Sequence, residues 1–438
     1  MNLITFKGGI HPPCHKELTE NKLTTKMEIP SQVVIPLRQH IGAPNEVKVA
    51  EGEKVKTGQV IGESSAFVSA SVHASCSGIV KKIGMYPHPV LGGCLAVVIE
   101  SDGQDTWIEK EEHRNWEQIS PLELRKIIKD RGIVGMGGAG FPTHVKLTPP
   151  ENKPIDTVIL NGAECEPYLT ADHRVMVERV KDVVLGLKII MKVLGVKRAY
   201  IGIEINKKNA LFLMEKAVRS EKRIKVIPLK VKYPQGSEKH LIKTILQKEV
   251  PSGKLPMDVK TVVLNVSTAL AIKEAVVNGL PLIEREITVI GRPINESKNL
   301  RVRLGTLFTE VIKTCGGFVE TPARVIMGGP MMGIAQKTLD LPIIKTTCGI
   351  LALTKEDISL EIPSNCIRCG KCVDACPMKL MPNMLGLLAQ RRKLNELREY
   401  HLSDCIECGC CAFVCPAKRP LVHYFKLGKY LIAKDDKK

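Results

Sequence analysis

Two copies of one cysteine pattern lie near the C-terminus of this chain of 438 residues. In each copy three cysteines are spaced three positions apart, a fourth follows four positions later, and a proline comes next. The eight cysteines are Cys366, Cys369, Cys372 and Cys376 in the first copy, and Cys405, Cys408, Cys411 and Cys415 in the second. This spacing is typical of proteins that hold two [4Fe–4S] clusters. The sequence therefore predicts a pair of cubane iron–sulfur sites.

The spacing also predicts which cysteines share a cluster. Three closely spaced thiolates can wrap one face of a cubane, but the fourth cysteine lies too far along the chain to close the same cluster and therefore ligates the other one. One predicted ligand set comprises Cys366, Cys369, Cys372 and Cys415, and the other comprises Cys405, Cys408, Cys411 and Cys376. Pro377 and Pro416 end the local helical turns, because proline cannot donate the next backbone hydrogen bond.

Zinc and disulfide bonds are the alternative uses of paired cysteines. Zinc ribbons usually supply four ligands without a third evenly spaced cysteine and a following proline. Disulfide bonds call for an oxidising compartment, and the first residues, MNLITFKGG, lack the apolar core of a secretory signal. Iron–sulfur clusters in a reducing, cytoplasmic environment are therefore favoured. The other cysteines, among them Cys410, show no ligand spacing and are expected to be small buried apolar residues.

The net charge limits the kinds of partner. The chain carries 64 Lys and Arg residues against 46 Asp and Glu residues, a formal net charge of +18. Such a charge favours nucleic acid, an anionic membrane surface or acidic redox partners, and only the last two fit iron–sulfur chemistry. The best candidate for a membrane span, residues 183–196, is interrupted by Lys188 and Lys192. We therefore expect peripheral contact with a membrane and no binding of nucleic acid.

The pattern of apolar residues, glycines and prolines changes several times along the chain, which is long enough for three or four domains. Short β-rich runs come first, strands then alternate with helices, and a second β-rich region precedes the cysteines. The fold class is predicted as multidomain α/β plus β. The expected segments are an N-terminal arm (1–32), a barrel-sandwich hybrid (33–112), a Rossmann-like α/β domain (113–283), a β-grasp domain (284–350), a ferredoxin-like α-helical two-cluster domain (351–425) and a charged tail (426–438).

The second segment resembles the barrel-sandwich hybrid fold of lipoyl and biotinyl carriers. The resemblance rests on VKTGQVIG at residues 55–62 and ASVHASCSG at residues 70–78. Carrier domains attach their cofactor to a lysine in the hairpin between the two halves, and this hairpin has no lysine. We therefore expect the carrier fold without the carrier function.

The third segment alternates apolar strands with amphipathic helices. Such alternation predicts a parallel sheet with a ligand at the carboxyl ends of its strands. The expected strands are 157–160, 199–203, 224–229 and 261–264, and the expected helices are 122–131, 173–194, 208–220, 236–247 and 268–278. Between the two cysteine motifs, one helix kinked near Pro382 is expected over residues 379–400.

Four loops of this segment are rich in glycine or polar residues. In the first, five glycines fall within nine positions (132–140), so backbone N–H groups can approach a phosphate, and Lys146 adds a positive charge. The other three, at the ends of expected strands, are NGAECEPY (161–168), YPQGSE (233–238) and NVST (265–268). Each loop alone is also consistent with a plain turn, but four on one side of a sheet predict a nucleotide-like pocket.

Together these loops carry a family resemblance. GMGGAGFPTHVKL, LNGAECEP, YPQGSEK and LNVST resemble the flavin- and NADH-binding subunit of respiratory complex I. With TFKGGIHPP near the N-terminus, MGGPMMG at residues 327–333 and the paired cysteine motif, almost the whole chain resembles the C subunits of the Rnf family, the ion-translocating ferredoxin:NAD oxidoreductases. Where the complex I subunits have an arginine and an acidic residue, this chain has Met136 and Ala163.

The resemblance implies that the cofactors are noncovalent FMN, NAD(H) and two [4Fe–4S] clusters. It places the FMN phosphate over the glycine-rich loop, the isoalloxazine and nicotinamide rings beside two glutamates, and the NADH side against the YPQG loop. The implied cofactor-binding residues are Gly135, Gly137, Gly138, Gly140, Phe141, Lys146, Asn161, Glu164, Glu166, Gly236, Glu238 and Asn265. Since a flavin itself exchanges hydride and single electrons, we expect no catalytic acid, base or nucleophile from the protein.

The implied function is that of a peripheral subunit at the cytoplasmic face of the cell membrane. It would exchange hydride with NAD(H) at FMN and pass single electrons through two clusters to other subunits, and indirectly to ferredoxin. Two alternatives stay open: a flavin and iron–sulfur cobalamin reductase on the same scaffold, and a non-enzymatic iron–sulfur relay with a vestigial α/β pocket. Reduction of an artificial acceptor by NADH distinguishes an enzyme from a relay.

Overall fold

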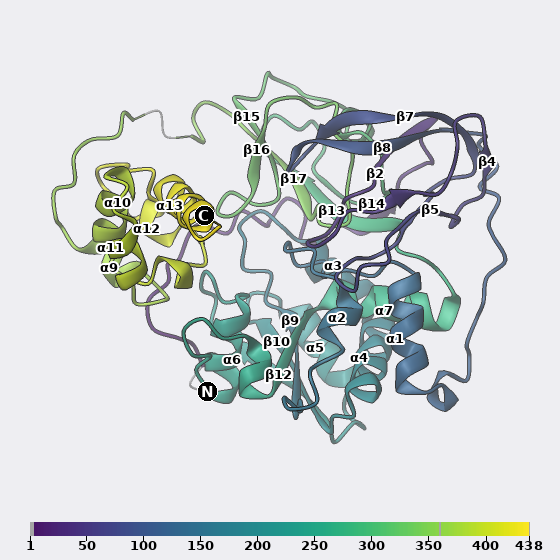
Figure 1. The fold of residues 1–438 in the computed structure, drawn as a ribbon, viewed down its shortest axis with the longest axis horizontal. Coiled ribbons are helices and arrows are strands. Elements are labelled where there is room, and N and C mark those ends of the chain that lie inside the picture. The colour runs from purple at the N-terminus through teal and green to yellow at the C-terminus, as the bar shows by residue number, and fades with distance from the viewer. Residues whose placement is uncertain (1–3, 359–360, 438) are drawn as a thin grey trace.

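The computed structural model describes residues 4–358 and 361–437, which form an α/β domain, two β-rich domains and a cysteine-rich helical domain (Figure 1). The α/β domain lies below the two β-rich domains in this view, and the cysteine-rich domain, in yellow, stands to one side. The coarse prediction of a multidomain chain of α/β and β parts is confirmed.

A four-stranded parallel sheet forms the centre of the α/β domain. Its strands are β9 (Thr157–Gly162), β10 (Arg198–Glu204), β11 (Ile224–Leu229) and β12 (Thr261–Asn265), in the order β11-β10-β9-β12. The chain runs outward from β9 to β11 and then returns to the other side of β9 for β12. The strand order therefore reverses between β9 and β12, which is where open α/β sheets bind their ligands.

Helices cover both faces of this sheet. They are α1 (Pro121–Asp130), the short α2 (Thr143–Lys146), α3 (Ala171–Glu178), α4 (Val180–Leu194), α5 (Lys208–Ala217), α6 (Glu238–Leu246) and α7 (Val266–Asn278), with 3-10 turns at Trp116–Gln118 and Pro256–Val259. The apolar residues of β9 and β12 are buried on both faces, as expected for a parallel sheet. On one face α4 and α7 pack so closely that a Cβ atom at Gly186 would lie 1.9 Å from the carbonyl oxygen of Ala269.

The single helix predicted over residues 173–194 is wrong, because α3 and α4 are separate helices that meet at Arg179. Arg179 leaves the helical conformation (φ −123°), and its guanidinium pairs with Asp182 and Glu274. The break lets α3 pack against α5 and the neighbouring β domain while α4 packs against α7. No glycine or proline marks this point, so the local sequence gives no sign of it.

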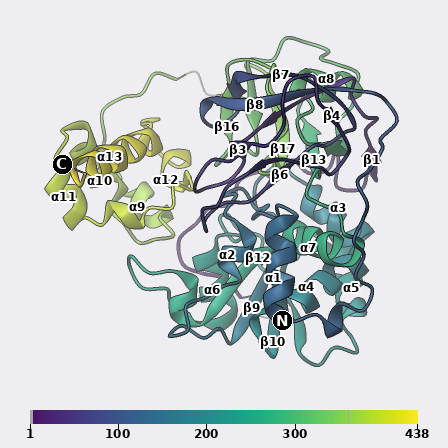
Figure 2. The ribbon, with the colours of Figure 1, turned by 45° about the vertical axis from the view of Figure 1, so that its right-hand side comes forward.

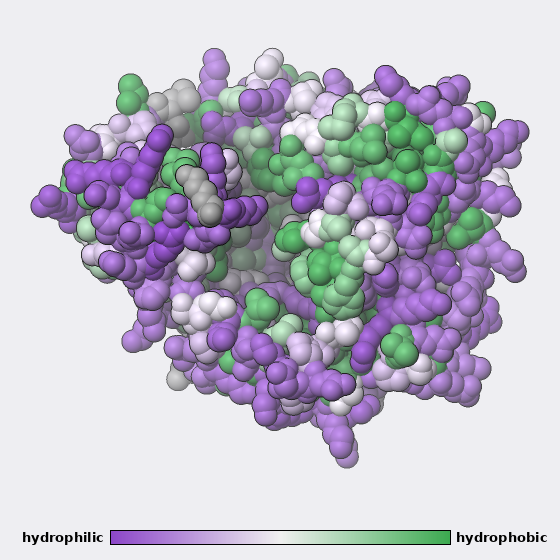
Figure 3. Space-filling model, viewed as in Figure 1, coloured by the Kyte–Doolittle hydropathy of each residue, from purple (hydrophilic) through white to green (hydrophobic). Residues whose placement is uncertain are grey.

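The first β-rich domain is a sandwich of two small antiparallel sheets. One sheet has the order β2-β8-β7-β4 and the other the order β3-β5-β6. The strands are β2 (Gln32–Pro36), β3 (Glu46–Val47), β4 (Lys54–Val55), β5 (Val60–Glu63), β6 (Val72–His73), β7 (Gly78–His88) and β8 (Gly92–Ser101). Apolar side chains gather over β7 and β8 on the face shown in Figure 3, and Met85, Val90 and Leu91 of this hairpin are exposed.

The second β-rich domain contains a mixed six-stranded sheet in the order β1-β14-β13-β17-β15-β16. Its elements are β1 (Thr24–Lys26), β13 (Glu284–Ile290), β14 (Lys298–Arg303), α8 (Phe308–Thr314), β15 (Arg324–Met327), β16 (Ile334–Gln336) and β17 (Gly349–Leu353). Strand β1 comes from the segment expected to be a separate N-terminal arm and pairs in parallel with β14. Residues 24–26 are therefore part of this domain.

The cysteine-rich domain consists of short helices: α9 (Lys371–Ala375), α10 (Pro382–Gln390), α11 (Leu394–Glu399), α12 (Cys410–Phe413) and α13 (Leu421–Asp435), with a 3-10 turn at Leu402–Asp404. The one kinked helix expected over residues 379–400 is instead the pair α10 and α11, and Pro382 begins α10 rather than bending it. Residues 426–435, expected to belong to a charged tail, are instead part of the helix α13. This helix buries Phe425 and Gly428 in the cysteine-rich domain. Figure 2 shows α6 on the side of the α/β domain that faces this domain.

No helix within residues 4–358 and 361–437 is both long and apolar enough to cross a membrane.

The close approach of α4 and α7 gives a stability prediction. Gly186→Ala should destabilise the α/β domain by about 1–3 kcal/mol, because the new methyl group overlaps the Ala269 carbonyl and forces the helices apart. Gly84→Ala is the matched control, since a Cβ atom there meets nothing closer than 3.7 Å. Thermal unfolding of both variants checks the prediction, and equal melting temperatures would contradict it.

Candidate functional site

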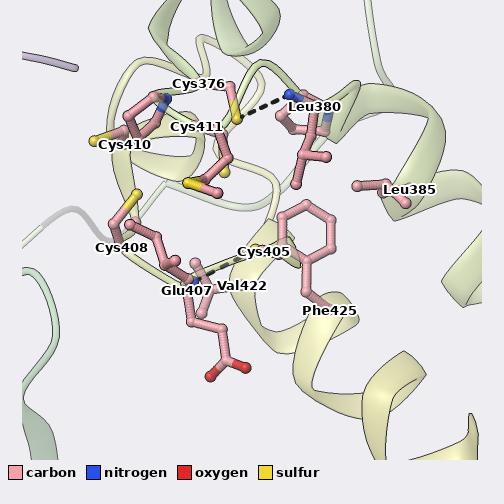
Figure 4. A pocket seen from close by; sticks show the side chains of 15 residues that line it. Cys376, Leu380, Leu385, Cys405, Glu407, Cys408, Cys410, Cys411, Val422 and Phe425 are labelled. Carbon is pink, nitrogen blue, oxygen red and sulfur yellow. Dashed lines mark hydrogen bonds between the residues drawn. The ribbon is translucent and has the colours of Figure 1, made fainter. Parts of the chain in front are cut away.

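The eight motif cysteines surround two hollows in the cysteine-rich domain. The inner hollow is lined by the motif cysteines Cys376, Cys405, Cys408 and Cys411 and also by Cys410, and the outer hollow is lined by Cys366, Cys369, Cys372 and Cys415. Figure 4 shows Cys376, Cys408 and Cys411 around the inner hollow, with Leu380, Leu385 and Phe425 closing one side. Each hollow takes three cysteines from one motif and the fourth from the other, which is the grouping that the spacing predicts.

The two motifs adopt the same backbone conformation. Arg368 and Glu407, at equivalent positions, have φ of +57° and +56°, and Gly370 and Gly409 have φ of +79° and +82°. These left-handed residues turn the chain so that successive cysteines face one point, and a short helix, α9 or α12, begins directly after each glycine. The repeat in sequence is therefore a repeat in structure.

The arrangement of sulfur atoms fits a cluster better than a single ion. Among the described residues, no three or more His, Cys, Asp or Glu side chains converge closely enough to hold one metal ion. The cysteines instead stand around the wall of a hollow, as a cubane requires, and thiolates are the ligands that iron–sulfur clusters use. Burial raises the pKa of Cys405 to about 11, so a positive centre is needed to keep such a thiolate ionised.

The hollows differ in their surroundings. The hydroxyl of Tyr233 in the α/β domain donates a hydrogen bond of 2.8 Å to the carbonyl oxygen of Cys408, which lines the inner hollow. Cys366 and Cys369 of the outer hollow are exposed to solvent. The inner hollow is therefore linked to the YPQG loop through Cys408, whereas two ligand positions of the outer hollow are open to solvent.

The glycine-rich loop presents free backbone at the edge of the α/β domain. Residues 137–139 are exposed, and their amides have no acceptor within the part of the chain that the structure describes. Gly138 has φ of +115°, and a Cβ atom there would meet nothing within 4 Å. The ends of the loop are fixed, because the amide of Gly135 donates to the carbonyl of Phe141 (2.8 Å) and the amide of Met136 donates to the hydroxyl of Thr268 (2.9 Å).

The loop lies at the reversal of strand order. Asn161 at the end of β9 and Asn265 at the end of β12 are register partners, and a Cβ atom at Gly137 would lie 3.4 Å from the Cβ of Asn265. Asn265 also caps α7, since its side chain accepts a hydrogen bond of 2.8 Å from the amide of Ser267. Free amides beside the N-terminus of a helix of 13 residues form a favourable place for a phosphate.

The YPQG loop closes the opposite side of this region. The Asn161 amide group donates a hydrogen bond of 2.8 Å to the carbonyl of Gly236, and the ammonium of Lys146 pairs with the carboxylate of Glu238. Lys146 therefore lies near the predicted pocket but is partnered by an acid. A bound phosphate would have to share Lys146 with Glu238.

Glu164 is buried and bonded to protein groups. Its carboxylate accepts hydrogen bonds from the amides of Asp172 (2.7 Å) and His173 (3.2 Å), and the ammonium of Lys16 lies 4.0 Å away. Burial raises the pKa of Glu164, and Lys16 opposes this shift. Lys16 also donates to the carbonyls of Glu164, Glu166 and Leu169. The N-terminal segment therefore holds in place the loop of residues 161–168, here called the acidic loop.

Glu166 connects the acidic loop to the second β-rich domain. Its two carboxylate oxygens accept hydrogen bonds from the amides of Met331 (3.1 Å) and Met332 (2.8 Å). A Cβ atom at Gly329 would lie 2.3 Å from this carboxylate, so the close approach requires glycine. Burial raises the pKa of Glu166 to about 7. The contacts of Glu164 and Glu166 with the isoalloxazine and nicotinamide rings stay a prediction. What the structure adds is that both carboxylates are hydrogen-bonded to protein groups.

Three residues that hydrogen-bond to the site loops were not predicted from the sequence. Lys16 holds the acidic loop, Asp172 accepts a hydrogen bond of 2.6 Å from the Asn265 side chain, and Arg285 donates one of 2.6 Å to the carbonyl of Met136. Arg285 thus brings a guanidinium behind the glycine-rich loop, in which this chain has Met136. All three lie far along the chain from the groups that they hold, so no local pattern marks them.

Comparisons with known proteins agree with this division. Models of four families match: the RnfC barrel sandwich hybrid domain (residues 4–104), the Nuo51 FMN-binding domain (128–274), the SLBB domain (287–335) and the 4Fe-4S dicluster domain (359–416). The glycine-rich loop, the acidic loop and the YPQG loop all lie within the FMN-binding match. Flavin and iron–sulfur clusters are therefore supported as cofactors independently of the loop geometry.

Full-length relatives identify the family. The C subunit of a proton-translocating ferredoxin:NAD(+) oxidoreductase complex from Clostridium ljungdahlii is 54% identical over 97% of this chain and 93% of its own length. The chain belongs to the family of C subunits of ion-translocating oxidoreductase complexes. Other C subunits are 48% identical in Acetobacterium woodii, over 97% of this chain and 96% of the relative, and 42% identical in Rhodobacter capsulatus, over 97% and 82%.

A solved structure resembles this chain in fold alone. A chain of an NAD+-reducing [NiFe]-hydrogenase in the H2-reduced state has a TM-score of 0.50 and 16% sequence identity, and the match covers 76% of this chain and 69% of that one.

Pairs of cysteine substitutions test the shared ligation. If the fourth cysteine of each motif ligates the cluster of the other motif, Cys376→Ala with Cys405→Ala removes two ligands of one cluster. Cys366→Ala with Cys376→Ala then removes one ligand of each cluster. We expect the first pair to keep about half of the bound iron and the second pair to keep almost none. Iron and acid-labile sulfide analysis of the reconstituted proteins measures the bound cluster. If each motif instead supplies all four ligands of one cluster, the two pairs should give the reverse result.

The buried Glu166 gives a pH prediction. Its pKa rises from an ordinary value of 4.5 to about 7 in the folded chain. The folded state therefore binds this proton more tightly, so the stabilisation is complete below pH 4.5 and is lost as the pH rises to about 7. The melting temperature of the natural protein relative to that of Glu166→Gln should fall across this window, by the equivalent of as much as about 3 kcal/mol. A constant difference would contradict the raised pKa.

Proposed function

We propose that this chain is the electron-exchange subunit of an ion-translocating ferredoxin:NAD oxidoreductase complex. It exchanges hydride with NAD(H) at FMN and passes single electrons through two [4Fe–4S] clusters to other subunits of the complex and indirectly to ferredoxin. The observation that carries the proposal is the inner hollow beside the flavin-domain loops, with Tyr233 bonded to Cys408. Similarity to whole C subunits supports the same function.

The loop geometry supports the cofactor residues that the family resemblance implies. We assign the FMN phosphate to the loop of Gly135, Gly137, Gly138 and Gly140, with Lys146, Asn161 and Asn265 nearby. The rings and the nicotinamide are assigned to the side formed by Phe141, Glu164, Glu166, Gly236 and Glu238. When bound, FMN converts between hydride and single-electron exchange. The protein orients the cofactors and excludes water, and no side chain is assigned as an acid, base or nucleophile.

The order of the two iron–sulfur sites follows from their surroundings. We assign Cys376, Cys405, Cys408 and Cys411 to an inner cluster next to the α/β domain, and Cys366, Cys369, Cys372 and Cys415 to an outer cluster. Because Cys366 and Cys369 are exposed, the outer cluster is the one that another protein can approach. Electrons that leave FMN for another protein of the complex therefore pass the inner site before the outer one, and electrons that arrive from it pass the outer site first.

The finer architecture and location belong to the same proposal. The parallel sheet with order β11-β10-β9-β12 supports a Rossmann-like domain, and the six-stranded sheet with α8 supports a β-grasp domain over much of residues 284–350. The chain would bind peripherally to the membrane part of the complex on the cytoplasmic side, where NAD(H) and ferredoxin are available. Its positive charge suits an anionic membrane surface or acidic partner subunits.

Purified protein reconstituted with iron, sulfide and FMN tests the function. NADH should reduce ferricyanide or a viologen, and cob(II)alamin should not be a better acceptor than these dyes. Flavin that fails to bind, with NADH inert and both clusters present, would favour a plain iron–sulfur relay. Preferential reduction of cob(II)alamin would favour a cobalamin reductase.

A charge placed in the phosphate loop tests the flavin assignment. Gly138→Asp puts a carboxylate where the phosphate is expected, so FMN affinity should fall at least tenfold because like charges repel. Gly195→Asp is the matched control, since Gly195 of the same domain also has a positive φ and open space at its Cβ position. Flavin fluorescence on dilution measures both affinities. Equal affinities would exclude this loop as the phosphate site.

A further inference from the structure

Tyr233 occupies the junction of three parts of the chain. It is only 2% exposed, and its backbone amide and carbonyl both pair with Ile10 of the N-terminal segment at 2.9 Å. Three residues later, Gly236 is bonded to Asn161 of the predicted flavin pocket. The Tyr233 hydroxyl donates a hydrogen bond to the carbonyl of Cys408 in the cysteine-rich domain.

The surroundings of this hydrogen bond are apolar and closed. Tyr233 packs in one buried cluster with Ile10, Ala375, Cys408 and Cys410, against which Cys165 and Met331 also pack. The partner of the Tyr233 hydroxyl is a carbonyl oxygen, which can only accept, so the hydroxyl is the donor. A hydrogen bond away from water is electrostatically stronger than one at the surface, and losing its donor leaves a buried carbonyl unpaired.

Within the described parts of the chain, the other hydrogen bonds between these two domains do not end on a predicted cluster ligand. His240 lies 3.1 Å from the carbonyl of Pro377, and Ser252 and the amide of Gly253 bond to the carboxylate of Asp404. These contacts dock the cysteine-rich domain against the side of α6. Tyr233 differs because its partner is the peptide of Cys408 itself, in a loop whose next residue, Gly409, packs against Met331.

We propose that Tyr233 is a positioning residue whose hydroxyl fixes the Cys408 peptide, and with it the inner cluster, against the loops of the α/β domain. The proposal deepens the proposed function, since it rests on Cys408 being a ligand of that cluster. The positive end of the O–H dipole points toward the ligand loop, so it also favours the reduced, more negative state of the inner cluster.

Tyr233→Phe removes this dipole and keeps the ring. The inner cluster should become harder to reduce, so one of the two midpoint potentials should fall while the other stays unchanged. Amides in the loop of residues 408–411 should exchange with solvent at least threefold faster, because the carbonyl of Cys408 loses its tether. Tyr200→Phe in β10 is the matched control for losing a tyrosine hydroxyl in the same domain.

The measurements are a dithionite titration of the reconstituted protein followed by electron paramagnetic resonance, and hydrogen–deuterium exchange of the same sample. Neither requires FMN or NADH, so their outcome is independent of whether the chain oxidises NADH. The proposal would be overturned if Tyr233→Phe matched Tyr200→Phe in both midpoint potentials and in the exchange rate of the 408–411 loop. Equal shifts of both clusters would also overturn it, because they would indicate a general structural change.

A second variant covers the case in which Tyr233→Phe does not assemble its clusters. Replacing Tyr233 by 3-fluorotyrosine keeps the hydroxyl and makes it a stronger donor. The same single midpoint potential should then rise, opposite to the effect of phenylalanine. An unchanged potential in a fully loaded fluorotyrosine protein would contradict the role of the hydroxyl.

Discussion

The hydrogen bond between Tyr233 and the Cys408 carbonyl links the α/β domain to a predicted ligand of the inner cluster, so it connects the two kinds of chemistry in this chain. Hydride chemistry needs an open pocket at the ends of parallel strands, whereas iron–sulfur ligation needs thiolates held in a nearly closed hollow. One polypeptide can serve both only if the two sites are adjacent and the space between them is filled. The buried cluster of Ile10, Tyr233, Ala375, Cys408 and Cys410 fills that space.

The N-terminal segment has a larger structural role than its composition suggests. Ile10 pairs with Tyr233, the amide of Gly9 donates to the carbonyl of Ala375, and Lys16 gathers three carbonyls of the acidic loop. Farther along, β1 completes the six-stranded sheet. A segment that looks like an extended arm therefore ties the α/β domain, the second β-rich domain and the cysteine-rich domain together.

The glutamates of the acidic loop show how a site residue can also be part of the scaffold. Glu166 is fixed by the amides of Met331 and Met332, and Glu164 by the start of α3 and by Lys16. Burying two carboxylates raises the pKa of both, and backbone donors and one ammonium oppose that cost. Because the donors to Glu166 come from the second β-rich domain and Lys16 comes from the N-terminal segment, the shape of the predicted ring pocket depends on how these parts assemble.

The sequence by itself determined the cysteine spacing, the alternation of strands and helices in the α/β domain and the glycine-rich loop, because each depends on residues close together in the chain. The boundary between α3 and α4 and the helical continuation of α13 were decided by tertiary packing, since the local sequence contains no breaker at Arg179 and reads as a charged tail after Phe425. The partners of Glu166, Lys146 and Tyr233 were decided the same way. Hydrogen bonds between residues more than 90 positions apart leave no periodic signal, and only the folded chain brings their donors and acceptors together.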